Sequence, residues 1–318
     1  MSKNKFRLTL AAAIAGLALA NCASQVSNGA QAGEAVARQA GDVTVSPAGI
    51  ATAWIPAGTF TMGSPDDEIG RWEWEGPQRQ VTISDGFWMG VYPVTQEHWQ
   101  AVMGNNPSYF YENPAAGETQ GRRPVESVSW YDAILFANRL SILEGLNPAY
   151  SIGGSTNPDD WGEVPHWAMS ATWDDVEIVP GSNGWRLPTE AQWEFAARAG
   201  TTAAFSNGAS DWKDNTSIDG IGWFGFNSGG MTREVGLKQP NPWGLHDIHG
   251  NVWEWVWDWF GEYPNLAETD PTGASSGSLR VLRGGCWFHF AQFVRSAARS
   301  LGNPFFHNNN LGVRLVRP

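Results

Sequence analysis

Apolar residues recur every three or four positions in two segments of this chain, which is the spacing of an amphipathic helix. Ser129 with Asp132 supplies an N-terminal cap for the first segment, and Thr189 with Gln192 forms a capping box before the second. A glycine follows the last periodic residue of each segment. The sequence therefore predicts helices from Ser129 to about Gly145, from Thr189 to Arg198 and, over a shorter span, from Thr95 to Met103.

Strand-like runs are short and are separated by turn residues, in a chain with 37 Gly and 19 Pro. From about Ile50 onward we find no second break in composition, no repeat and no linker. These patterns predict one α+β domain with low regular secondary structure, whose core rests on packing of its 19 Trp. The predicted strands are Ala53–Ile55, Phe60–Met62, Val81–Ser84, Phe87–Met89, Val281–Arg283 and Val313–Val316.

The amino terminus has the pattern of an export signal. Basic residues precede an apolar run of 13 residues, Leu8–Ala20, which is too short to span a bilayer. Cleavage after Ala20 would suit soluble export, whereas Leu19–Cys22 resembles a bacterial lipobox. Because a cysteine this close to the cut is improbable by chance, we favour a signal peptide over residues 1–21 and lipidation of Cys22.

Residues 22–48 are rich in Ser, Ala, Gly and Gln and lack a hydrophobic period, which predicts a flexible tether. As a random coil it would hold a domain of residues 49–318 roughly 25–30 Å from its anchor. The expected location is the cell surface or the outer membrane, as an exported lipoprotein that meets the membrane only through its lipid.

The net charge of the chain excludes some classes of binding partner. Removal of residues 1–21 leaves 17 basic against 32 acidic side chains, a net charge of −15. Nucleic acid and anionic lipid are therefore poor partners. Once Cys22 carries lipid, Cys286 is the remaining thiol of the chain, so no internal disulfide is expected.

The segment Asp247–Glu254 combines hard oxygen ligands. Asp247 and Glu254 offer carboxylates, and a tight loop can turn the carbonyls of Gly250 and Val252 inward, which suits Ca²⁺. The alternative is an Asp turn followed by an aromatic segment without a metal. No further ligand follows the nearby histidines at zinc spacing.

The last 37 residues, Leu282–Pro318, contain no Asp, Glu or Lys. Aromatic residues and one thiol stand there among Gly, Arg and Asn with neither a strand period nor a helix period. This pattern favours side chains displayed on a loop-rich platform, and therefore a contact surface rather than a reaction centre. The alternative is that the Phe residues of this region are ordinary core.

A series of short segments carries a more specific signal. The segments are Ile55–Gly63, Tyr92–Thr95, Arg123–Val125, Val128–Trp130, Arg186–Glu194, Gly250–Trp255, Arg283–Gly285 and Gly312–Arg314. In this order they resemble the formylglycine-generating-enzyme (sulfatase-modifying factor) family over about Trp54 to Pro318. The resemblance implies an elaborated C-type-lectin-like fold, poor in regular structure, and a structural calcium site at Asp247, Gly250, Val252 and Glu254.

The oxidase members of that family hold copper between two cysteine thiolates shortly after the Arg-Gly-Gly step, as soft Cu(I) demands. In this chain Cys286 comes too early, and His289 and Phe or Val stand where the pair would fall. We therefore expect no enzyme activity of this type.

The C-terminal region also resembles the variable proteins diversified by retroelements, of the Treponema type. Randomised adenines in Asn codons cannot yield Trp, Met, Lys, Gln or Glu, and from Phe288 to Asn308 only Gln292 is of those types. An Arg, Gly and Trp skeleton would stay fixed within a variable region of about residues 282–318. The residues expected to vary and to bind ligand are Cys286, Phe288, His289, Phe290, Phe293, Val294, Ala298, Ser300, Leu301, Gly302, Phe305, Phe306, His307 and Val313.

The resemblances leave three hypotheses. The preferred one is a surface-displayed lipoprotein that binds an unknown extracellular protein or glycan, without catalysis, through a hypervariable aromatic patch. The second is a metal-dependent oxidase acting on a cysteine-bearing peptide. The third is an envelope glycan-binding lipoprotein without diversification.

Overall fold

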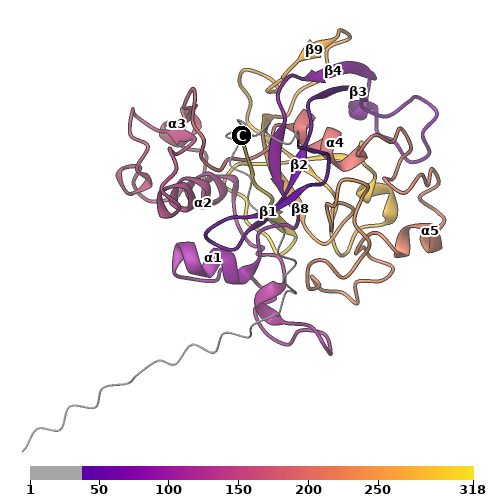
Figure 1. The fold of residues 1–318 in the computed structure, drawn as a ribbon, viewed down its shortest axis with the longest axis horizontal. Helices are drawn as coiled ribbons and strands as arrows, with labels where there is room; N and C mark the ends of the chain where they lie inside the picture. Colours follow the sequence, from indigo (N-terminus) through magenta and orange to yellow (C-terminus); the bar gives the residue numbers. More distant parts are fainter. Residues whose placement is uncertain (1–37) are drawn as a thin grey trace, which may run out of the picture. The chain divides into compact units, whose positions relative to one another are not determined.

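Three β-sheets of three or four strands and a short two-stranded ribbon organise residues 38–318, the part of the chain described by this computed structural model (Figure 1). The expected signal peptide, the lipidation site Cys22 and the tether up to residue 37 lie outside the described residues. The folded unit begins at Arg38. Residues 38–48, expected in the tether, therefore belong to the domain, because strand β1 (Val43–Val45) pairs with β2 (Ala51–Ile55).

The first four-stranded sheet joins both ends of the domain. Its order is β1-β2-β5-β13, with β5 at Phe87–Gly90 and β13 at Val316–Arg317. A three-stranded sheet, β3-β4-β9, consists of Gly58–Met62, Arg79–Ile83 and Glu268–Thr269. The two-stranded ribbon consists of β6 (Tyr150–Ser151) and β7 (Glu177–Ile178).

The second four-stranded sheet carries the C-terminal region. Its order is β11-β10-β8-β12, with strands Arg299–Gly302, Arg280–Arg283, Trp253–Trp259 and Leu311–Val313. Strands β10 and β11 are antiparallel, whereas β12 runs parallel to β8. The expected single strand Val313–Val316 is wrong, because β12 ends at Val313 and the chain crosses to the other sheet before β13.

All three predicted helices are confirmed. Helix α1 (Gln96–Met103) is capped by Thr95, α2 (Trp130–Leu143) has the Ser129–Asp132 capping box, and α4 (Glu190–Arg198) has the Thr189–Gln192 capping box. Helices α3 (Ala171–Asp174) and α5 (Asn215–Asp219) are single turns that the sequence did not signal. In Figure 1, α1, α2 and α3 lie on one side of the central strands and α5 on the other. Four short 3₁₀ helices complete the list: η1 (Glu73–Glu75), η2 (Gln120–Arg122), η3 (Pro158–Asp160) and η4 (Ala291–Val294).

Tryptophan forms much of the core between the second sheet and α2. Trp130 and Trp255 are fully buried, and each indole N–H donates to a backbone carbonyl across the sheet–helix boundary, Trp130 to Val256 at 2.8 Å and Trp255 to Val128 at 3.0 Å. These bonds satisfy the polar edge of rings that otherwise contribute apolar area. Several other indoles are exposed, so the expectation that the tryptophans pack in the core holds for only some of them.

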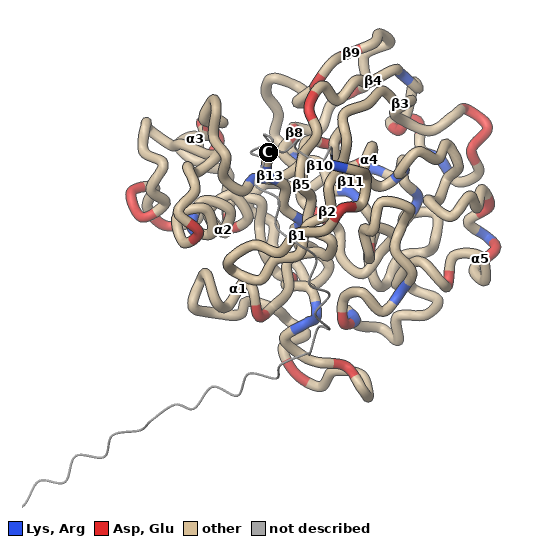
Figure 2. Tube along the Cα trace, viewed as in Figure 1, with Lys and Arg blue, Asp and Glu red and all other residues tan. Residues whose placement is uncertain are grey.

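Buried ion pairs hold the C-terminal region to the rest of the domain. Arg283 donates to Glu194 at 2.5 Å, and Arg299 donates to both oxygens of Glu190 at 2.6 and 2.8 Å. All of these side chains are buried. The acid-free C-terminal region therefore takes its carboxylates from distant segments, and the arginines gather around β10, β11 and α4 (Figure 2).

A further pair ties η1 to this region. Arg295 donates to both carboxylate oxygens of Glu75 at 2.8 and 2.7 Å and also bonds Glu68, and the Arg295 and Glu75 side chains have no exposed surface. Bidentate pairs of this kind fix geometry strongly. Among residues 38–318, no helix is both long enough and apolar enough to cross a bilayer.

Candidate ligand-binding surface of the C-terminal region

The residues expected to vary fall into three classes of exposure. Exposed are Phe288 (46%), Phe290 (72%), Leu301 (40%), Phe306 (48%) and His307; half-buried are His289, Phe293, Ser300 and Phe305; buried are Cys286, Val294, Ala298, Gly302 and Val313. The exposed and half-buried residues lie in β11 and in the loops before and after it. The platform is thus a sheet edge with two loops, and not loop alone as the sequence indicated.

The buried members of the set, apart from Gly302, have almost no exposed side-chain surface to offer a ligand in this structure. Val313 lies in the parallel strand β12 next to β8, and Val294 ends η4 against Gly285, where an added Cβ would lie 2.4 Å from Val294 Cγ1. Gly302 has no side chain to offer, and a Cβ there would lie 2.8 Å from a ring carbon of Trp255. Substitution at these positions would disturb packing rather than change specificity.

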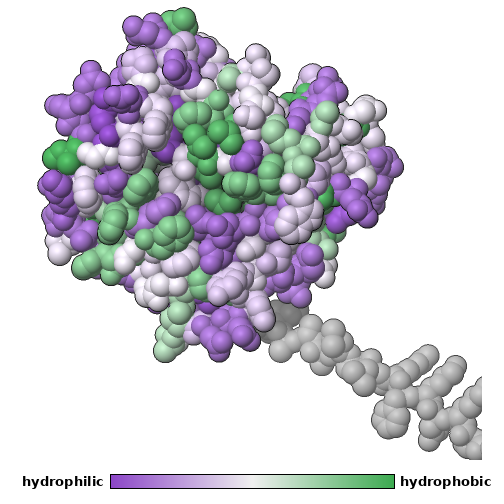
Figure 3. Space-filling model, turned by 180° about the vertical axis from the view of Figure 1, so that it is seen from behind, coloured by the Kyte–Doolittle hydropathy of each residue, from purple (hydrophilic) through white to green (hydrophobic). Residues whose placement is uncertain are grey.

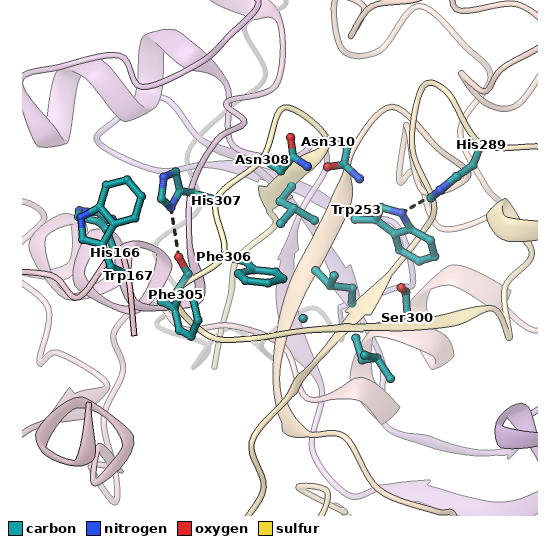
Figure 4. A pocket seen from close by; sticks show the side chains of 14 residues that line it. His166, Trp167, Trp253, His289, Ser300, Phe305, Phe306, His307, Asn308 and Asn310 are labelled. Atoms are coloured by element: carbon teal, nitrogen blue, oxygen red, sulfur yellow. Dashed lines mark hydrogen bonds between the residues drawn. The ribbon is translucent and has the colours of Figure 1, made fainter. Parts of the chain in front are cut away.

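A cavity of about 510 Å³ opens beside β11 (Figure 4). Half of the positions expected to vary line it. Its lining residues are His166, Trp167, Trp253, Leu282, His289, Ser300, Leu301, Gly302, Phe305, Phe306, His307, Asn308, Asn310 and Leu311. Figure 4 shows Phe305, Phe306 and His307 on one side of it and Trp253 with His289 on the other. This volume lies within the range of about 300–1,000 Å³ typical of ligand pockets.

A second cavity of about 420 Å³ is lined by Phe288 and Phe290, the two most exposed phenylalanines of residues 286–298. Trp212, Lys213 and the exposed Phe226 contribute other parts of its wall. The positions expected to vary therefore line two separate cavities. Figure 3, which shows the molecule from behind, shows hydrophobic residues gathered in patches among polar ones rather than spread evenly.

Aromatic rings form a continuous line that extends beyond the positions expected to vary. Successive ring centroids lie between 4.3 and 6.3 Å apart along Trp74, Trp72, Phe293, His289, Phe288, Trp287, Phe110 and Tyr109. Trp72 and Trp74 are stacked with an interplanar angle of 2° and are both exposed. Arg295, through Glu75 of η1, holds this segment beside the loop of residues 286–298.

The sequence reasoning missed several contributors to this surface, among them Trp253 and Asn310 in the cavity wall and the aromatic residues His166, Trp167, Trp72 and Trp74. Trp167 is 87% exposed and packs edge to face on His307, with ring centroids 5.9 Å apart. The sequence offered one usable signal, which is that tryptophans in polar, turn-rich segments have no apolar neighbours to bury them. Their convergence on the C-terminal region depends on long-range pairing.

Cys286, His289 and Trp253 form a small polar cluster, in which His289 and Trp253 line the cavity and Cys286 is buried behind them. The Trp253 indole N–H donates to His289 Nδ1 at 3.0 Å, and Cys286 Sγ lies 3.3 Å from the same nitrogen. Burial raises the pKa of the Cys286 thiol to about 12 and lowers the pKa of His289 to about 4. Both groups are therefore neutral at pH 7, and Cys286 is a thiol rather than the thiolate that copper or nucleophilic chemistry requires.

The expected calcium ligands have other partners. Both oxygens of Glu254 accept bonds from Arg314, at 2.8 to 3.0 Å, and one also accepts from the Trp193 indole at 2.6 Å. Asp247 Oδ2 accepts from Gly236 N at 2.8 Å, and burial raises the Asp247 pKa to about 6. A guanidinium already neutralises Glu254, so the arrangement does not fit the four-ligand calcium site that the sequence predicted.

Comparison with known proteins identifies the family and the fold. The family described as "Sulfatase-modifying factor enzyme 1-like domain" matches residues 39–318. The solved structure of Treponema denticola variable protein 1 is similar with a TM-score of 0.77 and 40% sequence identity, covering 87% of this chain and 99% of that one. The fold is therefore an elaborated C-type-lectin-like fold, as expected.

Two sequence relatives differ in the activity that their names describe. The "Chaperone protein LppX" of Paenibacillus barcinonensis is 35% identical over 260 residues, 75% of this chain and 82% of that protein. The formylglycine-generating enzyme of Mus musculus is 33% identical over 288 residues, 82% of this chain and 73% of the enzyme. The chain belongs to the sulfatase-modifying factor family, in which one fold serves both enzymes and proteins with other names.

Proposed function

We propose that this protein binds a ligand without catalysis, through the exposed side chains around β11. The observation that carries the proposal is the separation of roles within the C-terminal region. Four of its arginines, Arg283, Arg295, Arg299 and Arg314, are buried in ion pairs with distant glutamates. By contrast, Phe288, Phe290, Leu301 and Phe306 are exposed beside two cavities. A fixed frame with uncharged aromatic contacts is typical of a binding surface.

The similarity to Treponema denticola variable protein 1 supports this function, and we extend it to diversification by a retroelement. The expected export signal and Cys22 complete the proposal of a surface-displayed lipoprotein. A nearby partial copy of the 3′ end of the gene, differing only at adenines and beside a reverse-transcriptase gene, would establish diversification. Absence of both from the genomic region would leave a non-diversified binding protein.

The binding role has a direct test that uses one set of variants. Phe288→Ser, Leu301→Ser and Phe306→Ser should leave the melting temperature within about 1–2 °C of the parent, because exposed positions contribute little to stability. The same variants should change the binding of the full-length protein to envelope proteins and to glycans on arrays. Val313→Ser, in buried β12, is the matched control and should lower the melting temperature. Equal loss of stability in both groups would contradict the proposal.

The alternative is an oxidase, since the mouse relative is an enzyme. It would require copper at Cys286, whose thiol is buried and neutral. We expect no oxygen consumption by the copper-treated protein with a cysteine-bearing peptide. Oxygen uptake that disappears in Cys286→Ser would establish the oxidase instead.

A further inference from the structure

The cavity beside β11 contains a histidine whose hydrogen-bonding role is set by the scaffold. The indole N–H of Trp253 donates to His289 Nδ1 at 3.0 Å. An indole can only donate, so Nδ1 is an acceptor and the proton of the neutral imidazole stands on Nε2. Trp253 belongs to β8, which forms the interior of the sheet, and it therefore fixes the tautomer of a side chain in the neighbouring loop.

The Nε2–H group of His289 is free to bond a ligand. Among residues 38–318 this nitrogen has no hydrogen-bond partner, and it is not fully buried. Cys286 Sγ approaches Nδ1 at 3.3 Å and not Nε2. The wall of the cavity thus carries one oriented donor.

Asn310 supplies a second polar group. This side chain lines the same cavity and is nine-tenths buried. Its Oδ1 has no partner among the described residues, and its Nδ2 lies 3.8 Å from Cys286 Sγ, a weak contact. Whichever way the amide is turned, one polar atom is left without a strong partner. An unpaired buried polar group is costly, and a bound ligand that paired it would remove that cost.

The rest of the lining is apolar, aromatic or neutral. No Asp, Glu, Lys or Arg occurs among the lining residues that the structure describes. A charged ligand would therefore lose its hydration without an ionic partner. A sugar ring would bring several hydroxyls against walls formed largely by Phe305, Phe306 and Leu301, and most of them would be left unpaired.

We propose that this cavity takes an aromatic side chain of a protein partner together with the peptide group of that residue. This inference rests on the proposed binding function and adds the chemical class of the ligand. The peptide carbonyl accepts from His289 Nε2–H, the peptide N–H pairs with the Asn310 amide, and the ring packs between Phe306 and Leu301. A peptide group presents one acceptor and one donor, which complement His289 Nε2–H and the Asn310 amide; Ser300 and Asn308 also line the cavity and can bond other polar groups of the partner.

The test uses small probes on the full-length protein. N-acetyl-phenylalanine amide should shift the indole N–H resonance of Trp253 in a saturable way, because that group bonds the histidine that would hold the probe. Methyl glucoside and N-acetyl-aspartate amide should leave the resonance unchanged at the same concentration. A shift by methyl glucoside equal to or larger than that by the phenylalanine probe would overturn the proposal in favour of a glycan.

Variants isolate the hydrogen bond from the packing. His289→Phe keeps an aromatic ring but removes the donor, and it should weaken binding of the phenylalanine probe by about threefold to tenfold. His289→Gln restores an N–H donor and should recover much of the affinity. Tyr111→Ala, at an exposed aromatic residue that lines neither cavity, is the control and should bind like the parent. Unchanged affinity in His289→Phe would overturn the assigned donor.

The two proposals fail in different ways. If full-length protein captures an envelope protein or glycan through Phe288 or Phe306 while the probe is silent, the binding function stands and the cavity assignment is wrong. If the probe binds as described but no macromolecule does, the cavity assignment stands and the proposed function is wrong.

Discussion

At the residue scale, burial sets the chemical state of the groups that would otherwise suggest an active site. Cys286 is a buried thiol, and desolvation raises its pKa to about 12. His289 is held neutral by burial, with its Nδ1 occupied by the Trp253 indole. A reactive cysteine instead needs nearby positive charge and exposure. The same residue types in an open, charged site would support catalysis.

The state of Cys286 leads to a prediction about reactivity. In a Cys22→Ser chain, Cys286 is the sole thiol, and it should not react with Ellman's reagent at pH 8 in the native state. Unfolding in guanidinium should release one thiol per chain. Rapid reaction of the folded protein at this pH would contradict the buried, protonated thiol and favour the oxidase alternative.

Asp258 gives a pH-dependent prediction. Burial, together with the neighbouring Glu190, raises its pKa to about 7. Its folded-state pKa lies above the unfolded value, so its favourable contribution is present at low pH and is lost as the pH rises through about 7. Asp258→Asn mimics the protonated form and can still accept from Glu190 N. We expect it to melt above the parent by several degrees at pH 8, with a gain that shrinks towards pH 5. A gain that instead grows on acidification would contradict the raised pKa.

At the element scale, ion pairs rather than sequence neighbours determine which segments lie beside the loops that are expected to vary. Trp72, immediately before η1, stacks on Trp74 of η1, and Glu75 of η1 is fully buried against Arg295. Arg299 also donates to the carbonyl of Trp74 at 2.7 Å. These contacts place an aromatic segment next to positions that are expected to vary and that lie some 220 residues later in the chain.

The contribution of the Arg295–Glu75 pair to stability can be tested by removing the arginine side chain. Arg295→Ala leaves the buried Glu75 carboxylate without its partner and should destabilise the domain by about 3–5 kcal/mol. Arg139→Ala breaks an exposed pair with Asp159 and should cost less than about 1 kcal/mol. Urea unfolding measures both. Similar losses in the two variants would show that Arg295 has no special role.

Elements also differ in how far local sequence specifies them. The capping boxes of α2 and α4 lie within four residues, so their signals are complete in a short window. Strand β8, Trp253–Trp259, is buried along most of its length and lacks the alternation of a half-exposed strand. It was therefore missed, as was β11, whose strand state depends on pairing with β10.

At the scale of the whole molecule, the chain is acidic, yet the candidate binding surface around β11 is largely uncharged. Most arginines of this region are paired with buried glutamates instead of being exposed. The net charge is −12, yet the lining of the cavity beside β11 is neutral in the described domain. Ligand binding there should depend little on ionic strength, because screening acts on exposed charges. A strong salt dependence of probe binding would indicate a different site.

Calcium gives a further prediction at this scale. Arg314 already neutralises Glu254, so addition of millimolar Ca²⁺ after EDTA treatment should leave the melting temperature unchanged. A ligand that binds only the folded state would raise it in proportion to its concentration and affinity. A clear rise, lost in Asp247→Asn, would restore the calcium site that the sequence predicted.

The sequence by itself determined the family, the fold class, the three main helices and the region of the candidate surface, because these depend on short motifs and on local composition. Only the tertiary structure decided which of the candidate residues reach solvent. Val294 and Phe293 are neighbours in the chain, yet one is buried and the other half-exposed. Side-chain direction follows from strand pairing, from η4 and from buried ion pairs between distant segments. None of these can be predicted from a short stretch of sequence.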